Sequence, residues 1–102
     1  MRLTDLSPAF IKLGAGGGIW HHDVPRSEAQ GVMFDCPVCK RHRVICWAPE
    51  VPLSVPPGPG RWTLVGDSFE TLTLAVAPPE TQSSVQMDCA HFHVQNGDIV
   101  PA

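Results

Sequence analysis

The chain has 102 residues, a formal net charge of −3 and 43% apolar residues, and its 11 prolines and 9 glycines are many for this length. Such a chain builds one domain with a thin core, and its apolar content is too high for a disordered tail. The charge does not favour nucleic acid as a partner, and no stretch approaches the roughly 18–20 apolar residues of a membrane-spanning helix.

The first thirty residues predict an irregular N-terminal arm, and residues 31–102 predict a β domain of about six short strands. The opening segment lacks the long apolar core of a secretory signal, so we expect an intracellular location. In that reducing compartment, clustered cysteines favour a metal site over disulfides. A loop-rich domain of this size needs such a staple.

Four strands are predicted in the middle of the chain. The runs GVMFDC (31–36) and RVICWAP (43–49) are rich in β-branched and aromatic residues. Residues 61–76 predict two further strands around a Gly-Asp-Ser turn, because apolar residues alternate with threonine or alanine in the second half. Between the two pairs, five prolines in residues 49–60 exclude a helix or a central strand. That segment is predicted to be an extended surface connection.

The chain is predicted to end in a hairpin. The dipeptide Asn96-Gly97 favours a tight turn, since both residues tolerate positive φ. Residues 85–95 then form the long arm, and residues 98–100 form the short arm.

The sequence C-P-V-C at residues 36–39 predicts half of a metal site. This spacing lets the thiolates of Cys36 and Cys39 reach one ion across a tight turn. Zinc takes four such ligands in a tetrahedron, so a second pair is needed, and we expect it to come from a distant segment.

The predicted hairpin arm can supply that second pair. In an extended strand Cys89, His91 and His93 share one face, with neighbours about 6.6 Å apart. Two adjacent side chains can converge on one ion, whereas three would be strained. We therefore predict a Zn²⁺ site with the ligands Cys36, Cys39, Cys89 and His91, and His93 is an alternate.

A local ligand set competes with this prediction. Cys36, Cys39, His42 and Cys46 read C-x2-C-x2-H-x3-C, which is tighter than most zinc knuckles. Cys46 lies in an apolar run, where a single cysteine more often acts as a small buried hydrophobic residue. The sequence favours the split site and leaves His42 and Cys46 as alternates.

The segments FDCPVC, RWTLVGDSFETLTL and HFHVQNGDIV together resemble a family of small bacteriophage and prophage proteins of unknown function, some labelled ammonia monooxygenase. The matching positions are Cys36, Pro37, Cys39, Trp62, Thr71, Leu72, His91, Phe92, Val94, Gly97 and Ile99. They span residues 34–99, about two-thirds of the chain. Lys40 stands where the family pattern has glycine, and Ala90 separates Cys89 from His91. The resemblance implies a phage setting and a zinc site, and it implies no reaction.

Four protein ligands would close the coordination shell, which is typical of a structural zinc. We therefore expect a non-enzymatic, zinc-stabilised β module that binds a phage or host protein or belongs to the virion, and that is able to form an oligomer. Trp20 and Trp62 are the candidate anchors for the partner. The alternative is a metal-dependent hydrolase with an open zinc site at the terminal hairpin, built on His91 and His93. The sequence contains neither H-E-x-x-H nor the zinc-deaminase signature.

Overall fold

The computed structural model describes residues 1–15, 20–57, 60–78 and 82–102. Within these residues the chain forms nine strands and two short 3-10 helices and no α-helix, which confirms the predicted mostly-β class. The elements are η1 (Leu3–Leu6), β1 (Ala9–Leu13), β2 (Trp20–His22), η2 (Arg26–Glu28), β3 (Gly31–Asp35), β4 (Arg43–Trp47), β5 (Trp62–Val65), β6 (Thr73–Val76), β7 (Val85–Gln86), β8 (His91–Gln95) and β9 (Asp98–Pro101).

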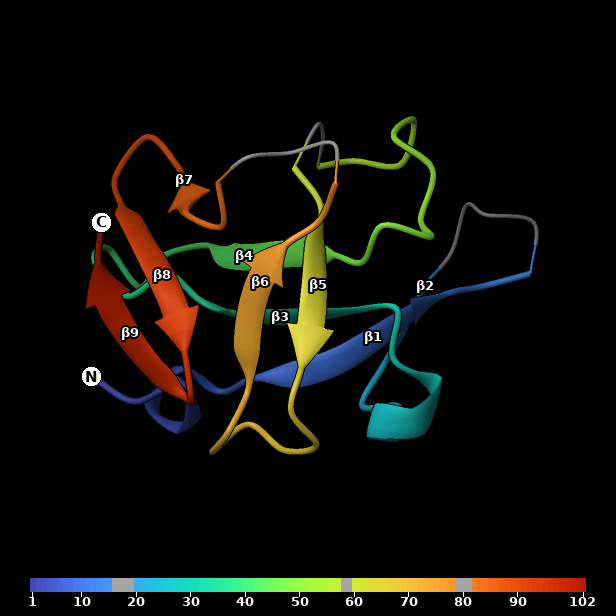
Figure 1. The fold of residues 1–102 in the computed structure, drawn as a ribbon, viewed down its shortest axis with the longest axis horizontal. Coiled ribbons are helices and arrows are strands. Elements are labelled where there is room, and N and C mark those ends of the chain that lie inside the picture. Colours follow the sequence, from blue (N-terminus) through green and yellow to red (C-terminus); the bar gives the residue numbers. More distant parts are fainter. Residues whose placement is uncertain (16–19, 58–59, 79–81) are drawn as a thin grey trace.

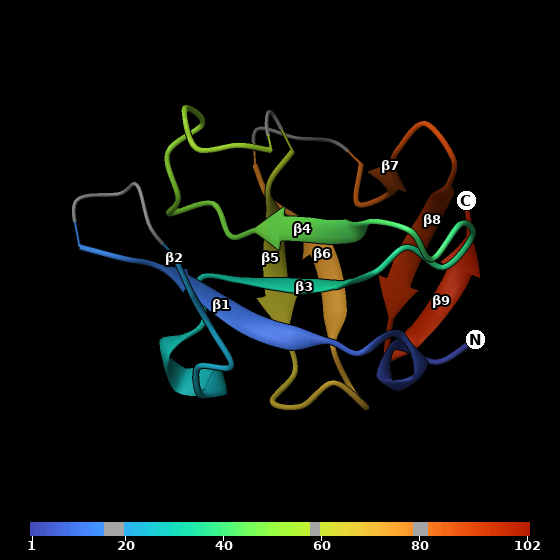
Figure 2. The same ribbon diagram turned by 180° about the vertical axis from the view of Figure 1, so that it is seen from behind.

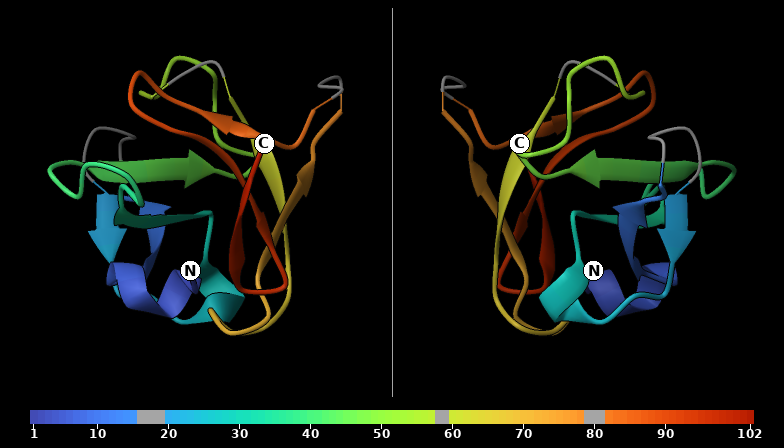
Figure 3. Two further views of the ribbon diagram at one scale, coloured as in Figure 1. Left: turned by 90° about the vertical axis from the view of Figure 1, so that its left-hand side faces the viewer. Right: turned by 90° about the vertical axis from the view of Figure 1, so that its right-hand side faces the viewer.

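The strands are arranged in two layers (Figure 1). The first layer is an antiparallel sheet in the order β2-β1-β3-β4. The second layer contains the β5-β6 pair and the sheet β7-β8-β9, with β6 next to β8. Strands of one layer run across those of the other, as Figure 2 shows from behind. Figure 3 views the two layers from the sides.

The main core lies between the layers. Val32 and Phe34 alternate along β3 and project towards the second layer, where they pack with Leu74 of β6 and with Phe92 and Val94 of β8. The rings of Phe34 and Phe92 meet edge to face, with centroids 6.0 Å apart. Each buried side chain of this size stabilises the fold by about 1.5–3 kcal/mol. This core fixes how the loops of the two layers meet.

A smaller core covers the outer face of the first layer. Ile11, Met33 and Trp47 project to that face and pack against Val51 of the proline-rich segment. The strands β3 and β4 are therefore buried on both faces, which is why their sequences are continuous apolar runs. The proline-rich segment therefore packs on this face of the sheet, and it is not only the surface connection that the sequence predicted.

Arg61 gives the proline-rich segment its shape. Its side chain is buried, with 5% of the residue exposed, and its guanidinium donates to five backbone carbonyls. The acceptors belong to Val51, Pro52, Val55, Pro57 and Gly60. Proline has no N–H to close turns by itself, so a planar group with five donors takes that role.

In the described part of the first thirty residues (1–15 and 20–30), the elements η1, β1, β2 and η2 are observed instead of the predicted irregular arm. β1 lies between β2 and β3, and η1 buries Leu3 and Leu6. The N–H of Leu3 donates to the carbonyl of Gly97 over 2.8 Å, and Arg2 pairs with Asp98 over 2.8 Å. Ala9, Phe10 and Ile11 of β1 are all buried, so this strand has no alternation of apolar and polar residues that could predict it.

The C-terminal part contains two hairpins where one was predicted. The predicted turn is present between β8 and β9, with φ of 47° at Asn96 and 77° at Gly97. The predicted long arm is divided into β7 and β8, joined by a tight turn in which the N–H of Met87 donates to the carbonyl of Ala90 over 2.8 Å. This extra turn and the strands β1 and β2 raise the strand number above the predicted six.

Candidate metal centre

Three thiols and one imidazole meet where the two layers join. The side chains are those of Cys36, Cys39, His42 and Cys89, and one ligand atom from each lies within 4.8 Å of the others. Cys36 is buried, Cys39 is half-buried, and His42 and Cys89 are exposed. Within the described part of the chain, no other group of three or more His, Cys, Asp or Glu side chains is placed to hold an ion.

The loop between β3 and β4 supplies three of the four side chains. The N–H of Cys36 donates to the carbonyl of His42 over 3.0 Å, and the N–H of Lys40 donates to the carbonyl of Cys36 over 3.1 Å. Lys40 has φ of 56°, a left-handed conformation that reverses the chain. The N–H of Arg41 lies 3.5 Å from the sulfur of Cys39 and donates to it. These backbone hydrogen bonds fold the loop around the thiols of Cys36 and Cys39.

The fourth side chain comes from the other layer. Cys89 lies in the tight turn between β7 and β8. Its sulfur is 3.3 Å from that of Cys36 and 3.6 Å from that of Cys39. It is also 3.9 Å from Nε2 of His42, whose Nδ1 is 3.1 Å from the sulfur of Cys39. Any ion held here would join the two layers.

These distances suit a tetrahedral metal site. Zinc bonds of about 2.3 Å to sulfur and 2.0 Å to nitrogen place sulfurs about 3.8 Å apart and sulfur about 3.5 Å from nitrogen. The sulfur of Cys89 is 3.3 and 3.6 Å from the other two sulfurs, close to the first value. A histidine binds an ion through one ring nitrogen, and those of His42 lie 3.1 Å (Nδ1) and 3.9 Å (Nε2) from the nearest sulfurs, on either side of the second value. A disulfide needs sulfurs at about 2.05 Å, and all four cysteines are free thiols. The residues present therefore fit a metal ion of the kind that soft sulfur ligands select.

The protonation of the thiols is uneven. Burial would raise the pKa of Cys36, but hydrogen bonds from the backbone N–H groups of Cys39 and Val38 and from neighbouring thiols outweigh it and lower the pKa to about 7. The pKa of Cys89 is raised to about 11 by its hydrogen bond to Cys36, with smaller effects from burial and from Cys39. The thiolate of Cys36 is thus favoured, while ionisation of Cys89 beside it is disfavoured. A cation bound between the sulfurs would favour ionisation of both thiols.

The structure brings together three of the four side chains that the sequence favoured. Cys36, Cys39 and Cys89 are adjacent, but His91 is not in the cluster. The alternation argument placed Cys89 and His91 on one strand face, whereas Cys89 lies in a turn and His91 begins β8. His42, from the competing local set, is the fourth member.

The other alternates lie elsewhere. Cys46 is fully buried in the main core, and burial raises the pKa of its thiol, so it acts as a hydrophobic residue. His93 on β8 pairs through Nδ1 with the hydroxyl of Ser83 at 3.2 Å. The combination of one local histidine and one remote cysteine was missed. The residues on either side of Cys89 could have indicated it, because Asp88 and Ala90 are poor strand formers and favour a turn.

The two candidate anchor tryptophans differ in position. Trp62 begins β5, packs against the main core, and donates its indole N–H to the carbonyl of Ser83 over 2.9 Å. Trp20 belongs to β2, and its side chain is outside the described part of the structure.

None of the described residues forms a helix long and apolar enough to cross a membrane. Comparison of the chain with protein-family models, with curated proteins and with solved structures found no match in any of the three.

Proposed function

We propose that the chain is a non-enzymatic β module stabilised by one structural Zn²⁺, held by Cys36, Cys39, His42 and Cys89. The observation that carries the proposal is the meeting of four ligand atoms from two layers within 4.8 Å. Three thiolates and an imidazole are ligands that select zinc in a reducing compartment. Bound zinc would supply folding free energy, because the unfolded chain has no such site.

A closed shell supports a structural role over a catalytic one. Four protein ligands leave no coordination position for water or substrate. The backbone N–H of Arg41, which donates to the sulfur of Cys39, would stabilise the charge of the bound thiolates. The side chains of Lys40 and Arg41 are exposed beside the cluster and add positive charge there.

We further propose that the module serves a bacteriophage or prophage and binds a protein partner, in the host cytoplasm or in the virion. Support for the phage setting is the resemblance of three sequence segments, at residues 34–39, 61–74 and 91–100. Support for a partner is the closed ligand set of the metal centre, which leaves a binding role in place of a catalytic one.

The alternative, a metal hydrolase at the terminal hairpin, has less support. His91 and His93 line one shallow pocket with Ser83 and Ala102. A zinc hydrolase needs a third protein ligand and a general base. Among the described residues no Cys, Asp or Glu side chain joins the two histidines as a ligand group.

Chelation tests the structural role. Zinc binding to small structural sites contributes about 10–16 kcal/mol, which exceeds the roughly 5–15 kcal/mol that stabilises a typical domain. Removal of zinc with a chelator under reducing conditions should therefore abolish the β-sheet circular dichroism signal at room temperature, and added zinc should restore it. A chain that keeps its signal and its melting temperature after verified zinc removal would disprove the proposal.

A further inference from the structure

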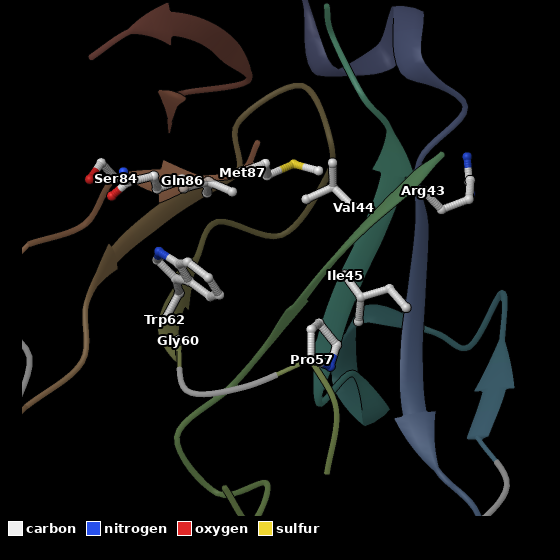
Figure 4. Close-up of a pocket in the computed structure, with 10 residues that line it drawn as sticks. Arg43, Val44, Ile45, Pro57, Gly60, Trp62, Ser84, Gln86 and Met87 are labelled. Carbon is white, nitrogen blue, oxygen red and sulfur yellow. The ribbon is translucent and has the colours of Figure 1, made fainter. Parts of the chain in front are cut away.

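A groove with a volume of about 470 Å³ lies between β4 and β7 (Figure 4). Its lining is mostly apolar and includes Ile45 of β4, Trp62 of β5 and Met87 just after β7. The charged group among its described lining residues is Arg43, whose guanidinium is paired with Asp35 at 2.9 Å. The groove is therefore close to neutral, and its volume lies in the range of functional binding sites.

One wall of the groove is the free edge of the first layer. β4 is the last strand in the order β2-β1-β3-β4. At one end of the β3–β4 ladder the N–H of Cys36 donates to the carbonyl of His42, and at the other end the N–H of Ala48 donates to that of Gln30. Antiparallel hydrogen bonds recur at every second residue, so the even-numbered residues from 42 to 48 bond to β3.

The odd-numbered residues Arg43 and Ile45 therefore direct their N–H and C=O groups away from β3. Both residues line the groove. In the described part of the chain β4 pairs with no strand other than β3, and no partner is seen for these four backbone groups. Unpaired groups along a strand edge are a template for another extended chain.

The opposite wall has the same character. In the β7–β8 hairpin the N–H of Met87 donates to the carbonyl of Ala90, which makes these two residues a hydrogen-bonded pair. By the same alternation, Gln86 directs its backbone N–H and C=O away from β8. Gln86 also lines the groove. Free backbone groups thus face the groove from both sides, with Trp62 and Met87 as its apolar lining.

We propose that this groove binds one extended, uncharged segment of a partner protein, which adds to β4 as a further strand and places an apolar side chain beside Trp62 and Met87. The inference rests on the proposed function, which gives the chain a protein partner. An extended segment suits this groove because a strand that adds to a sheet edge gains affinity from backbone hydrogen bonds. Its specificity comes from pockets that take alternate side chains.

The metal centre lies at one end of this groove. β4 begins directly after His42, and β7 ends three residues before Cys89. The ligand cluster therefore holds the two walls at that end, and zinc would set the distance between them.

A displayed library of random peptides, each about twelve residues long, tests the proposal. The library is selected on zinc-loaded wild-type protein and counter-selected on an Ile45→Pro variant. This substitution removes the outward N–H of Ile45 and leaves the hydrogen bonds to β3, since proline is tolerated where the N–H of an edge strand faces outward. Expected are peptides with apolar residues at alternate positions that bind the wild type about tenfold or more tightly than the variant.

Amide hydrogen exchange gives a second readout that needs no variant. A bound peptide should slow exchange at Arg43 and Ile45 about tenfold or more, because their N–H groups become hydrogen-bonded. The absence of any peptide that prefers the wild type, or a bound peptide that leaves both amides unchanged, would overturn the proposal. Zinc is measured in the same samples. A zinc-loaded chain without peptide binding refutes the groove alone, and a zinc-free chain that still binds peptide refutes the zinc proposal alone.

Discussion

At the scale of single residues, His42 and His91 separate the observed site from the one that the sequence favoured. His42 has ring nitrogens 3.1 and 3.9 Å from two sulfurs of the cluster, while His91 is not part of it. We expect His42→Ala to lower zinc affinity by more than about 100-fold, since loss of an outer-shell partner already costs 10–100-fold. His91→Ala should keep the wild-type affinity. Titration against a competing chelator measures both, and loss of zinc in His91→Ala alone would reverse the ligand assignment.

The three thiols of the site could be predicted from the sequence, but the histidine could not. The spacing of Cys36 and Cys39 indicates a turn that holds one ion, and Cys89 is the one cysteine far away along the chain. The choice of histidine depends on whether Cys89 lies in a strand or in a turn. That difference is set by pairing of β7 with β8, which involves only two residues of β7 and leaves no periodic pattern.

Lys40 is a second residue with a testable consequence. Its φ of 56° disfavours any side chain that carries a Cβ. We expect Lys40→Gly to raise the free energy of unfolding by about 1 kcal/mol, measured with urea in the presence of zinc. Lys40→Ala removes the same charge but keeps the Cβ, so it should give no such gain. Equal effects of the two variants would show that charge, and not backbone conformation, decides stability at this position.

At the scale of elements, the proline-rich segment depends on one side chain. Arg61→Met keeps a long apolar stem but removes all donors to the five carbonyls. We expect a loss of about 2 kcal/mol in the free energy of unfolding, because carbonyls next to the core lose their partners. Leu53→Met, at an exposed position of the same segment, is the control and should be close to neutral. A neutral Arg61→Met would mean that the segment holds its shape without the guanidinium.

The elements that the sequence predicted correctly are those whose own residues show a local pattern. The strands β3 to β6 and the Asn96-Gly97 turn follow from β-branched runs, alternation and turn residues. The strands β1 and β2 were not predicted, and they are stabilised by neighbours that lie elsewhere in the sequence. Their existence is a tertiary effect, so a local pattern could not reveal it.

At the scale of the whole molecule, the cluster lies where loops of the two layers meet. The loop between β3 and β4 belongs to the first layer, and the turn that carries Cys89 belongs to the second. A domain of 102 residues has little stability to spare, so an ion bound at this point would account for a large share of it. The two walls of the groove would lose their fixed spacing without this ion.

Acid should therefore loosen the molecule as a whole. Thiolates and neutral imidazole bind metal, and protons compete for the same atoms, so the zinc-dependent part of stability is present at neutral pH and is lost as the pH falls. Between about pH 8 and pH 5 we expect the melting temperature of the zinc-loaded chain to drop while zinc appears in the ultrafiltrate. A melting temperature that falls with zinc still bound would place the acid-sensitive group outside the cluster.

Native mass spectrometry of the purified wild-type chain and of Cys89→Ser tests the central claim most directly. The account predicts one zinc ion and four reduced cysteines in each wild-type chain, and loss of zinc in Cys89→Ser. A wild-type chain with less than about 0.2 zinc per molecule, or one whose mass shows Cys36 and Cys89 joined as a disulfide, would contradict it.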